Sequence, residues 1–481
     1  MAARGRRRLG AVLGALALVG AVAGYGVADA TGRVPGPLTQ DPVPQPYPEL
    51  VDAPGAGVPP ATPAPVAAAP LANGAPLPDP AVLAAATAPA LADPALGPAV
   101  SATVVDALTG AVLLDAGAGT GHEPASVLKL LTAVAALNRL GAVTTVDTTA
   151  VTTGDGPVVL VGGGDVLLSA GPGDPTAANG HASLADLADQ SARSLLEAGR
   201  TSVVVALDDS LFEGVGSGRG TGPGVSPSDI SNGFVAPVTA VAVDAGRTTP
   251  ENYAPRVADP GLAAAATFAA LLAERGVSVQ GTPERVVAEP GATVLGTVTS
   301  APLSQVVAHV LAVSDNNGAE ALARLVAVDA GAGTDFAGAG AAVLAEVAGL
   351  GVPVDGLRLA DGSGLADGSV LTPAALAGVL RAAADPGRPD LRPVLTGLPV
   401  AGLSGTLAPR FAVQTGAVAG QGLVRAKTGS LTGTTSLAGT VVDADGRLLV
   451  FAVMADRVPA SLPGRAAADR FVATLAGCGC R

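Results

Sequence analysis

The stretch "GLVRAKTGSLTGTTSLAGTVVDADGRLLVFAVMADR", residues 422–457, decides the fold because three strand-forming runs follow one another in it. Each run is rich in Val, Thr or Leu, and Asp445-Gly446 between the last two is typical of a tight hairpin turn. Strands joined by such short turns pair side by side in an antiparallel meander. We therefore expect three neighbouring strands here, followed by a helix over residues 463–477.

The first folded residues predict two further strands and a helix. The run "AVSATVVDALTGAVLLDAGAG", residues 99–119, has two strand-like segments around a turn at Thr109-Gly110. The run "PASVLKLLTAVAALNRLG", residues 124–141, favours a helix that starts at its proline and stops at its final glycine. This helix is apolar on nearly every face, so we expect it to be buried. Strands at both ends of the chain predict an α+β fold with one antiparallel sheet.

The middle of the chain, residues 143–292, has a different character and predicts a separate inserted domain. It contains strand-like runs, a helix-like run and the glycine-rich stretch "EGVGSGRGTGPGVSP". That stretch lacks the G-x-G-x-x-G spacing, and "VVLVGGGD" lacks the Gly-Lys-Ser/Thr of a phosphate loop, so both favour turns over nucleotide sites. Residues 99–142 and 293–477 are then the two parts of one domain that the insertion interrupts.

The first 98 residues predict export followed by a spacer. Four arginines between residues 4 and 8 precede a run of uncharged, mostly apolar residues, which is typical of a signal peptide or a membrane anchor over residues 1–30. Ala28-Asp29-Ala30 offers a cleavage site, so both alternatives stay open. Residues 31–98 are rich in Pro and Ala and favour a disordered linker. We expect the folded part to lie in the cell envelope, outside the cytoplasm.

The composition argues against several classes of protein. A net charge of −13 and a pI near 4.6 do not suit a nucleic-acid surface. Three scattered histidines offer little to a Ser-His-Asp hydrolase or a histidine-based metal centre, and we predict no metal and no cofactor. Cys478 and Cys480 lie at the C-terminus, where we expect a frayed end that cannot staple the fold.

The serine and lysine of "SVLK", residues 126–129, share one face of the predicted helix. A serine hydroxyl is a poor nucleophile until a base takes its proton. Arginine cannot be that base, whereas a lysine removed from water can. Only two of the 27 basic residues are lysines, Lys129 and Lys427. Ser126 and Lys129 are therefore a candidate nucleophile and base, although S-x-x-K alone is a weak signal.

A second motif, Ser314-Asp315-Asn316, falls between two helical stretches. A hydroxyl there suits proton relay, and an amide suits holding a substrate peptide group. The same three residue types are also the usual helix N-caps, which is the alternative interpretation.

A third motif, Lys427-Thr428-Gly429, ends a predicted strand. Lysine and threonine there suit a substrate carboxylate, and the glycine permits close approach of a substrate backbone. The N–H of Ser430 is placed to complete an oxyanion hole. The alternative is a strand-end lysine followed by a turn.

The motifs S-x-x-K, S-D-N and K-T-G in this order are the signature of penicillin-binding proteins and class A serine β-lactamases. Within that superfamily the chain resembles the D-alanyl-D-alanine carboxypeptidase/endopeptidases of the penicillin-binding-protein-4 type, which carry a large insertion between the first two motifs. The resemblance covers roughly residues 99–477 and includes "VGGGD", "DDSLF", "SDNNGAEALAR" and "DGSGLADGSVLTPAAL". It implies a β-lactamase/transpeptidase-like fold, in which a five-stranded antiparallel sheet flanked by helices lies beside a helical lobe.

The resemblance also implies a role for each motif residue. Ser126 would attack the penultimate D-Ala carbonyl of a peptidoglycan stem peptide and release the terminal D-Ala, after which water would hydrolyse the acyl-enzyme. Lys129 would be the general base and Ser314 the proton relay. The remaining implied roles are orientation of the substrate amide by Asn316, carboxylate binding by Lys427 and Thr428, and an oxyanion hole from the N–H groups of Ser126 and Ser430. β-Lactams mimic the same dipeptide and would acylate Ser126.

Lys129 must be neutral to act as a base, and we expect burial and the nearby Lys427 ammonium to lower its pKa. Competing interpretations are a β-lactamase, for which no deacylating glutamate stands out, and a non-hydrolysing sensor of wall peptides. A glycan-cleaving protein is disfavoured because the chain has no Trp and no evident carboxylate pair.

Overall fold

The computed structural model describes residues 74–212 and 226–480. These residues belong to one compact unit, residues 70–481. The predicted export segment and most of the predicted linker lie outside the described residues.

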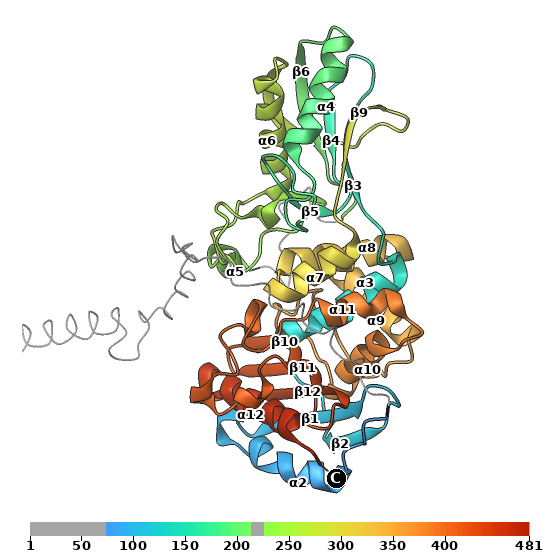
Figure 1. Ribbon diagram of the computed structural model, residues 1–481. Coiled ribbons are helices and arrows are strands. Elements are labelled where there is room, and N and C mark those ends of the chain that lie inside the picture. Colours follow the sequence, from blue (N-terminus) through green and yellow to red (C-terminus); the bar gives the residue numbers. More distant parts are fainter. Residues whose placement is uncertain (1–73, 213–225, 481) are drawn as a thin grey trace, which may run out of the picture. The chain divides into compact units, whose positions relative to one another are not determined.

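A five-stranded antiparallel sheet forms the base of the fold (Figure 1), with the order β10-β11-β12-β1-β2. β1 pairs with β12 from Ala99 opposite Asp456 to Asp106 opposite Leu449, so the two ends of the chain meet at the centre of the sheet. The meander and the two N-terminal strands that the sequence predicts are thereby confirmed. The bounds are β1 Ala99–Asp106, β2 Val112–Ala116, β10 Val424–Leu431, β11 Thr434–Val442 and β12 Leu448–Asp456.

The two faces of this sheet enclose separate apolar cores, because side chains alternate along a strand. On β12, Val450, Ala452 and Met454 pack with the helical lobe. Phe451 and Val453, between them in sequence, pack against the C-terminal helix. The helices of the lobe are α3 Lys129–Leu140, α7 Leu303–Val313, α8 Asn316–Ala330, α9 Phe336–Gly349, α10 Pro373–Ala384 and α11 Arg392–Thr396. The C-terminal helix is α12 Ser461–Gly477.

The helix expected to start at Pro124 is divided into two parts. Residues Ala125–Leu128 form a 3-10 turn, η2, and the α-helix α3 begins only at Lys129. The serine and lysine of the first motif therefore lie on opposite sides of this junction. Every residue of α3 from Lys129 to Leu137 is buried, as its apolar sequence predicts.

The inserted region forms a second, mixed sheet with the order β8-β6-β4-β3-β9 and its own apolar core. Its last strand ends at Thr299, so this sheet extends past residue 292, where the sequence placed the boundary. The strands are β3 Asp147–Thr152, β4 Val158–Val161, β6 Ser202–Asp208, β8 Ser278–Arg285 and β9 Thr293–Thr299. The helices are α4 Leu184–Glu197, α5 Pro227–Ser231 and α6 Pro260–Glu274. Short strands β5 Asp165–Leu168 and β7 Val241–Val243 pair beside this sheet.

The prediction of a disordered linker up to residue 98 is wrong for its last part. Residues Pro80–Leu91 form helix α2, which packs against α12 and buries Leu83 and Thr87. Asp79 caps this helix by accepting the N–H groups of Ala81 and Val82. The run is rich in alanine, the best helix former, and a proline at the first helical position costs little.

The C-terminus is held by the fold and is not frayed as expected. Cys478 and Cys480 are buried in the same core as α2 and α12, and the structure pairs them as a disulfide. The backbone N–H of Asp79 donates to the Cys480 carbonyl at 2.6 Å. In the part of the chain that the structure describes, no helix is long and apolar enough to cross a membrane.

Candidate active site

Ser126 lies on the η2 turn, which small residues hold close to β10. Ala125 has a φ of +50°. A Cβ added at Gly364 would lie only 2.0 Å from the carbonyl oxygen of Ala125, so a side chain there would clash with the turn. The Pro124 carbonyl accepts a hydrogen bond from Ser436 Oγ at 2.6 Å. The turn is therefore wedged between the loop at Gly364 and the sheet.

Lys129 places its amine among three oxygens. Nζ donates to Ser126 Oγ at 3.1 Å, to Asn316 Oδ1 at 2.5 Å and to the Ser363 carbonyl at 2.8 Å. The side chain is fully buried. The first two motifs of the sequence therefore meet at a buried amine.

The residues of the second motif have different contacts, and the N-cap interpretation holds for Asp315. Asp315 is the N-cap of α8 and accepts the Gly318 N–H at 2.7 Å. Ser314 ends α7 in the left-handed conformation, with φ +60°, and its Oγ accepts a hydrogen bond from Lys427 Nζ at 2.9 Å.

The third motif adds a second buried amine. Lys427 Nζ donates to two neutral oxygens, Ser314 Oγ and the Thr428 carbonyl, each at 2.9 Å. Thr428 Oγ1 donates to Thr406 Oγ1 at 3.0 Å. The structure thus brings the residues of all three motifs into one site.

The outer edge of β10 presents backbone groups beside this site. The Ala426 N–H donates to the Pro399 carbonyl, and the Val424 carbonyl accepts the Ala401 N–H, both at 3.0 Å, on the side away from β11. Backbone N–H and C=O groups point to alternate sides along a strand. The N–H groups of Thr428 and Ser430 therefore point to this same edge.

Gly429 has a reason to be glycine that the sequence did not reveal. A Cβ there would lie 2.0 Å from Ser436 Oγ and 2.6 Å from the Pro124 carbonyl oxygen. The absent side chain lets β10 approach the turn that carries Ser126.

Burial lowers the pKa of Lys129 to about 8, while the carboxylates of Asp361, Asp315 and Glu320 act in the opposite direction. Burial also lowers the pKa of Lys427 well below its usual range, with further lowering by the charges of Lys129 and Arg410. The expected lowering of the Lys129 pKa by burial is confirmed, and repulsion between the two amines adds to the lowering at Lys427. Burial thus favours the neutral form of both amines.

Sequence reasoning missed the loop that supplies the third oxygen to Lys129. The buried Asp361 carboxylate accepts hydrogen bonds from Ser363 Oγ and from the N–H groups of Gly364, Leu365 and Ala366. These bonds hold the loop so that the Ser363 carbonyl accepts the hydrogen bond from Lys129 Nζ. The signal was present in "DGSG", because an aspartate followed by glycine and serine is typical of a side-chain-capped turn.

A Ser-His-Asp arrangement also exists, away from this site. His122 contacts Ser101 Oγ through Nε2 at 2.9 Å and Asp456 Oδ2 through Nδ1 at 2.8 Å. Ser101 lies on β1 in the middle of the sheet and is only 4% exposed. These three residues link the strands and the β2–η2 loop, and a substrate cannot reach the hydroxyl.

Comparison with known proteins identifies the family. The D-Ala-D-Ala carboxypeptidase 3 (S13) family matches residues 83–256 and 250–475. The chain belongs to this family. It is 41% identical to carboxypeptidase DacB of Mycolicibacterium smegmatis, over 88% of this chain and 90% of that protein.

Solved structures agree with this assignment at the level of the fold. Penicillin binding protein 4 (dacB) from Haemophilus influenzae superposes with a TM-score of 0.65 at 20% identity, over 82% of this chain and 98% of that chain. The same protein complexed with a β-lactam gives a TM-score of 0.59 at 20% identity, over 81% and 98%. The predicted fold class and the predicted family, a D-Ala-D-Ala carboxypeptidase of the penicillin-binding-protein-4 type, are confirmed.

Proposed function

We propose that Ser126 is the nucleophile of this serine D-Ala-D-Ala carboxypeptidase, acting on peptidoglycan stem peptides. The observation that carries the proposal is the buried Lys129 amine, 3.1 Å from Ser126 Oγ and with its pKa lowered to about 8 by burial. An amine with this pKa is a suitable general base near neutral pH. This substrate places the enzyme outside the cytoplasm.

In the proposed acylation, neutral Lys129 takes the Ser126 hydroxyl proton as Oγ attacks the carbonyl of the penultimate D-Ala. The N–H groups of Ser126 and Ser430 would hold the oxyanion, and the open edge of β10 supports the second of these. The peptide C–N bond then breaks, and its nitrogen leaves with a proton relayed through Ser314. Asn316 orients both the Lys129 amine and the substrate amide. Water afterwards hydrolyses the ester and frees Ser126.

Lys427 and Thr428 are proposed to bind the terminal carboxylate of the substrate. Lys427 is buried and bonded only to neutral oxygens in the contacts described above, so a substrate carboxylate would supply the counter-charge that stabilises its protonated form. A β-lactam carries a carboxylate at the matching position and would acylate Ser126 in the same way.

Labelling with a fluorescent penicillin tests the nucleophile. Ser126→Ala is expected to abolish covalent labelling, while Ser101→Ala, which changes the serine of the buried Ser-His-Asp arrangement, keeps it. Labelling of folded Ser126→Ala protein would contradict the proposal. Release of D-Ala from a D-Ala-D-Ala peptide then separates the enzyme from a wall-peptide sensor, and rapid loss of the label would indicate a β-lactamase.

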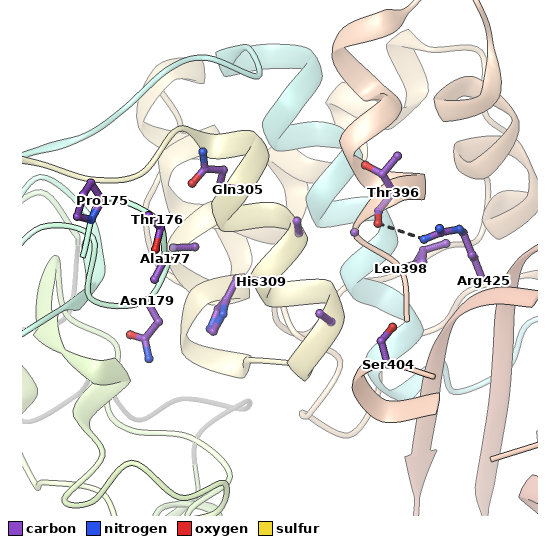
Figure 2. A pocket seen from close by; sticks show the side chains of 14 residues that line it. Pro175, Thr176, Ala177, Asn179, Gln305, His309, Thr396, Leu398, Ser404 and Arg425 are labelled. Carbon is purple, nitrogen blue, oxygen red and sulfur yellow. Dashed lines mark hydrogen bonds between the residues drawn. The ribbon is translucent and has the colours of Figure 1, made fainter. Parts of the chain in front are cut away.

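An open pocket of about 690 Å³ favours cleavage of cross-linked peptides as a second activity. It begins beside the proposed carboxylate subsite, because Arg425 lies two residues before Lys427 on the same face of β10. Figure 2 shows Gln305 and His309 of α7 facing this pocket, with Arg425, Thr396 and Ser404 on its other side. A leaving group longer than a single D-Ala would continue from Lys427 into these polar side chains.

A matched pair of substrates tests the second activity. Arg425→Ala is expected to lower cleavage of a cross-linked peptide dimer about tenfold relative to release of D-Ala from a monomeric pentapeptide, the equivalent of one charge-assisted hydrogen bond. An unchanged ratio of the two rates, or no cleavage of the dimer by the wild-type enzyme, would contradict it.

A further inference from the structure

The residue after Ser314 is held by a distant part of the chain. Residues 234–247 of the inserted region, which we call the brace, pack against the start of α8. At one end of the brace, Arg247 Nη2 donates to Asp315 Oδ2 at 2.6 Å, and Nη1 donates to Asp244 Oδ1 at 3.0 Å. Both partners in the first pair are buried to nine-tenths or more at the side chain.

The other end of the brace holds the next two residues of α8. Asn316 Nδ2 donates to the Phe234 carbonyl at 2.9 Å. Asn317 exchanges two hydrogen bonds with Ala236, one with its N–H at 2.9 Å and one with its carbonyl at 3.0 Å. The brace therefore contacts the side chains of all three residues that follow Ser314.

This corner of the chain is one that serine does not favour by itself. Ser314 has a φ of +60° between α7 and α8, a conformation that an L-residue adopts when its surroundings impose it. Two contacts of the proposed site depend on this corner at Ser314. Ser314 Oγ accepts a hydrogen bond from Lys427 Nζ, and Asn316 Oδ1 accepts one from Lys129 Nζ. A shift of the first turn of α8 would move both.

Arg247 is well placed to fix the corner. The turn before it has positive φ at Asp244 and Ala245, and Arg256 Nη1 holds the Ala245 carbonyl at 2.9 Å. Burial acts to raise the pKa of Asp315, but Arg247 and the Gly318 N–H keep it below its usual value, so the aspartate stays charged. The ion pair is thus between two buried charges whose geometry the surrounding turn restricts.

We propose that Arg247 is a positioning residue for the reaction at Ser126: through Asp315 it holds Ser314 and Asn316 against the two lysines. This gives the inserted region a part in acylation, and it rests on the proposed function of Ser126. Residues in such a role change reaction rates without contacting the substrate, because small displacements of the reacting groups are costly.

The test compares two arginines that each bridge two carboxylates. Arg247→Met is expected to slow the second-order acylation by fluorescent penicillin by about tenfold to a hundredfold. Arg285→Met is the matched control, since Arg285 pairs with Asp209 and Asp259 inside the inserted region. It is expected to lower the Tm but leave the acylation rate unchanged. Rates are measured well below each variant's Tm.

A double variant separates positioning from stability. Arg247→Met with Asp315→Asn removes both buried charges, so the Tm is expected to recover while acylation stays slow. The rates are compared above pH 9, where Lys129 is largely neutral with or without the Asp315 charge. Acylation that recovers together with the Tm, or an Arg247→Met enzyme that acylates at the wild-type rate, would overturn the proposal. Failure of the proposed function is distinguishable from these outcomes, because the wild-type enzyme would then not be labelled at Ser126 at all.

Discussion

At the scale of single residues, the proposed chemistry depends on two buried amines in different surroundings. Lys129 lies among three oxygens and feels three nearby carboxylates, which limit the fall in its pKa to about 8. Lys427 is bonded to neutral oxygens, and burial lowers its pKa well below the usual range. These surroundings suit the two proposed tasks. A base must lose its proton near neutral pH, whereas the lysine of a carboxylate subsite is stabilised in its protonated form by the negative charge of the substrate.

The pKa of Lys129 sets the expected pH dependence of acylation. With a pKa of about 8, roughly a tenth of Lys129 is neutral at pH 7 and half at pH 8. The rate of acylation by penicillin should therefore rise about tenfold from pH 6 to 7 and level off above pH 9. Lys129→Arg should show almost no acylation at any of these pH values. A flat profile from pH 6 to 10 in the wild-type enzyme would contradict Lys129 as the base.

The eight proposed site residues could be selected from the sequence because each has a side chain or backbone group suited to its proposed role and the motifs occur in a characteristic order. What the sequence could not show are contacts through backbone carbonyls and across long separations. The Ser363 carbonyl on Lys129 and the brace contact between Arg247 and Asp315 belong to this kind. The turn around Ser363 has a local signal in "DGSG", but nothing in the sequence shows that its carbonyl meets Lys129. The pair of Arg247 and Asp315 has no local signal, because packing of the inserted region against the helical lobe brings these two residues together.

At the scale of elements, strands and buried helices followed from period and turn chemistry, whereas α2 did not. The surrounding prolines made residues 31–98 appear uniform in composition, which hid the helix-forming run that begins at Pro80. The division of the first motif between η2 and α3 was also missed. It results from the packing of Ala125 between Gly364 and the sheet, and packing of that kind has no periodic signal.

Helix α2 should contribute to stability if it is part of the fold. Leu83 is fully buried against the core that contains α12, so Leu83→Ala should lower the free energy of unfolding by about 2–5 kcal/mol. Val82 lies next to it on the same helix and is 41% exposed, and Val82→Ala should change stability by less than about 0.5 kcal/mol. Equal effects of the two substitutions in a denaturant titration would mean that α2 does not pack as described.

The close contact between β10 and η2 gives a second prediction at this scale. Gly429→Ala would place a methyl group into Ser436 Oγ and the Pro124 carbonyl, so we expect a loss of about 1–3 kcal/mol of stability and slower acylation of Ser126. Gly349→Ala, in α9 with open space around it, should be neutral or slightly stabilising. Thermal unfolding and penicillin labelling of the two variants check this, and a fully active Gly429→Ala enzyme would disprove it.

At the scale of the whole molecule, the apolar cores divide the described chain into parts. The two cores on either side of the five-stranded sheet contain no residue from the range 147–299. The core of the second sheet consists only of residues from that range. A fourth cluster joins them, in which Leu325 and Ala321 of α8 meet residues such as Val166 and Val235. The sheet and helical lobe therefore have the apolar packing of an independent domain, and the insertion adds an interface along α8.

This division predicts the outcome of removing the insertion. The ends to be joined already touch, because the Ser300 N–H donates to the Val146 carbonyl at 2.9 Å and an Asn-Gly turn would connect them. The shortened chain should unfold cooperatively with a lower Tm, since Leu325 loses its cover. Its acylation by penicillin should be slower than that of Arg247→Met, because it lacks the contacts from Phe234 and Ala236 as well as the ion pair. Acylation by the shortened chain at the wild-type rate would contradict a positioning role for the brace. Failure of the shortened chain to fold would show that the two remaining cores cannot stabilise the domain by themselves.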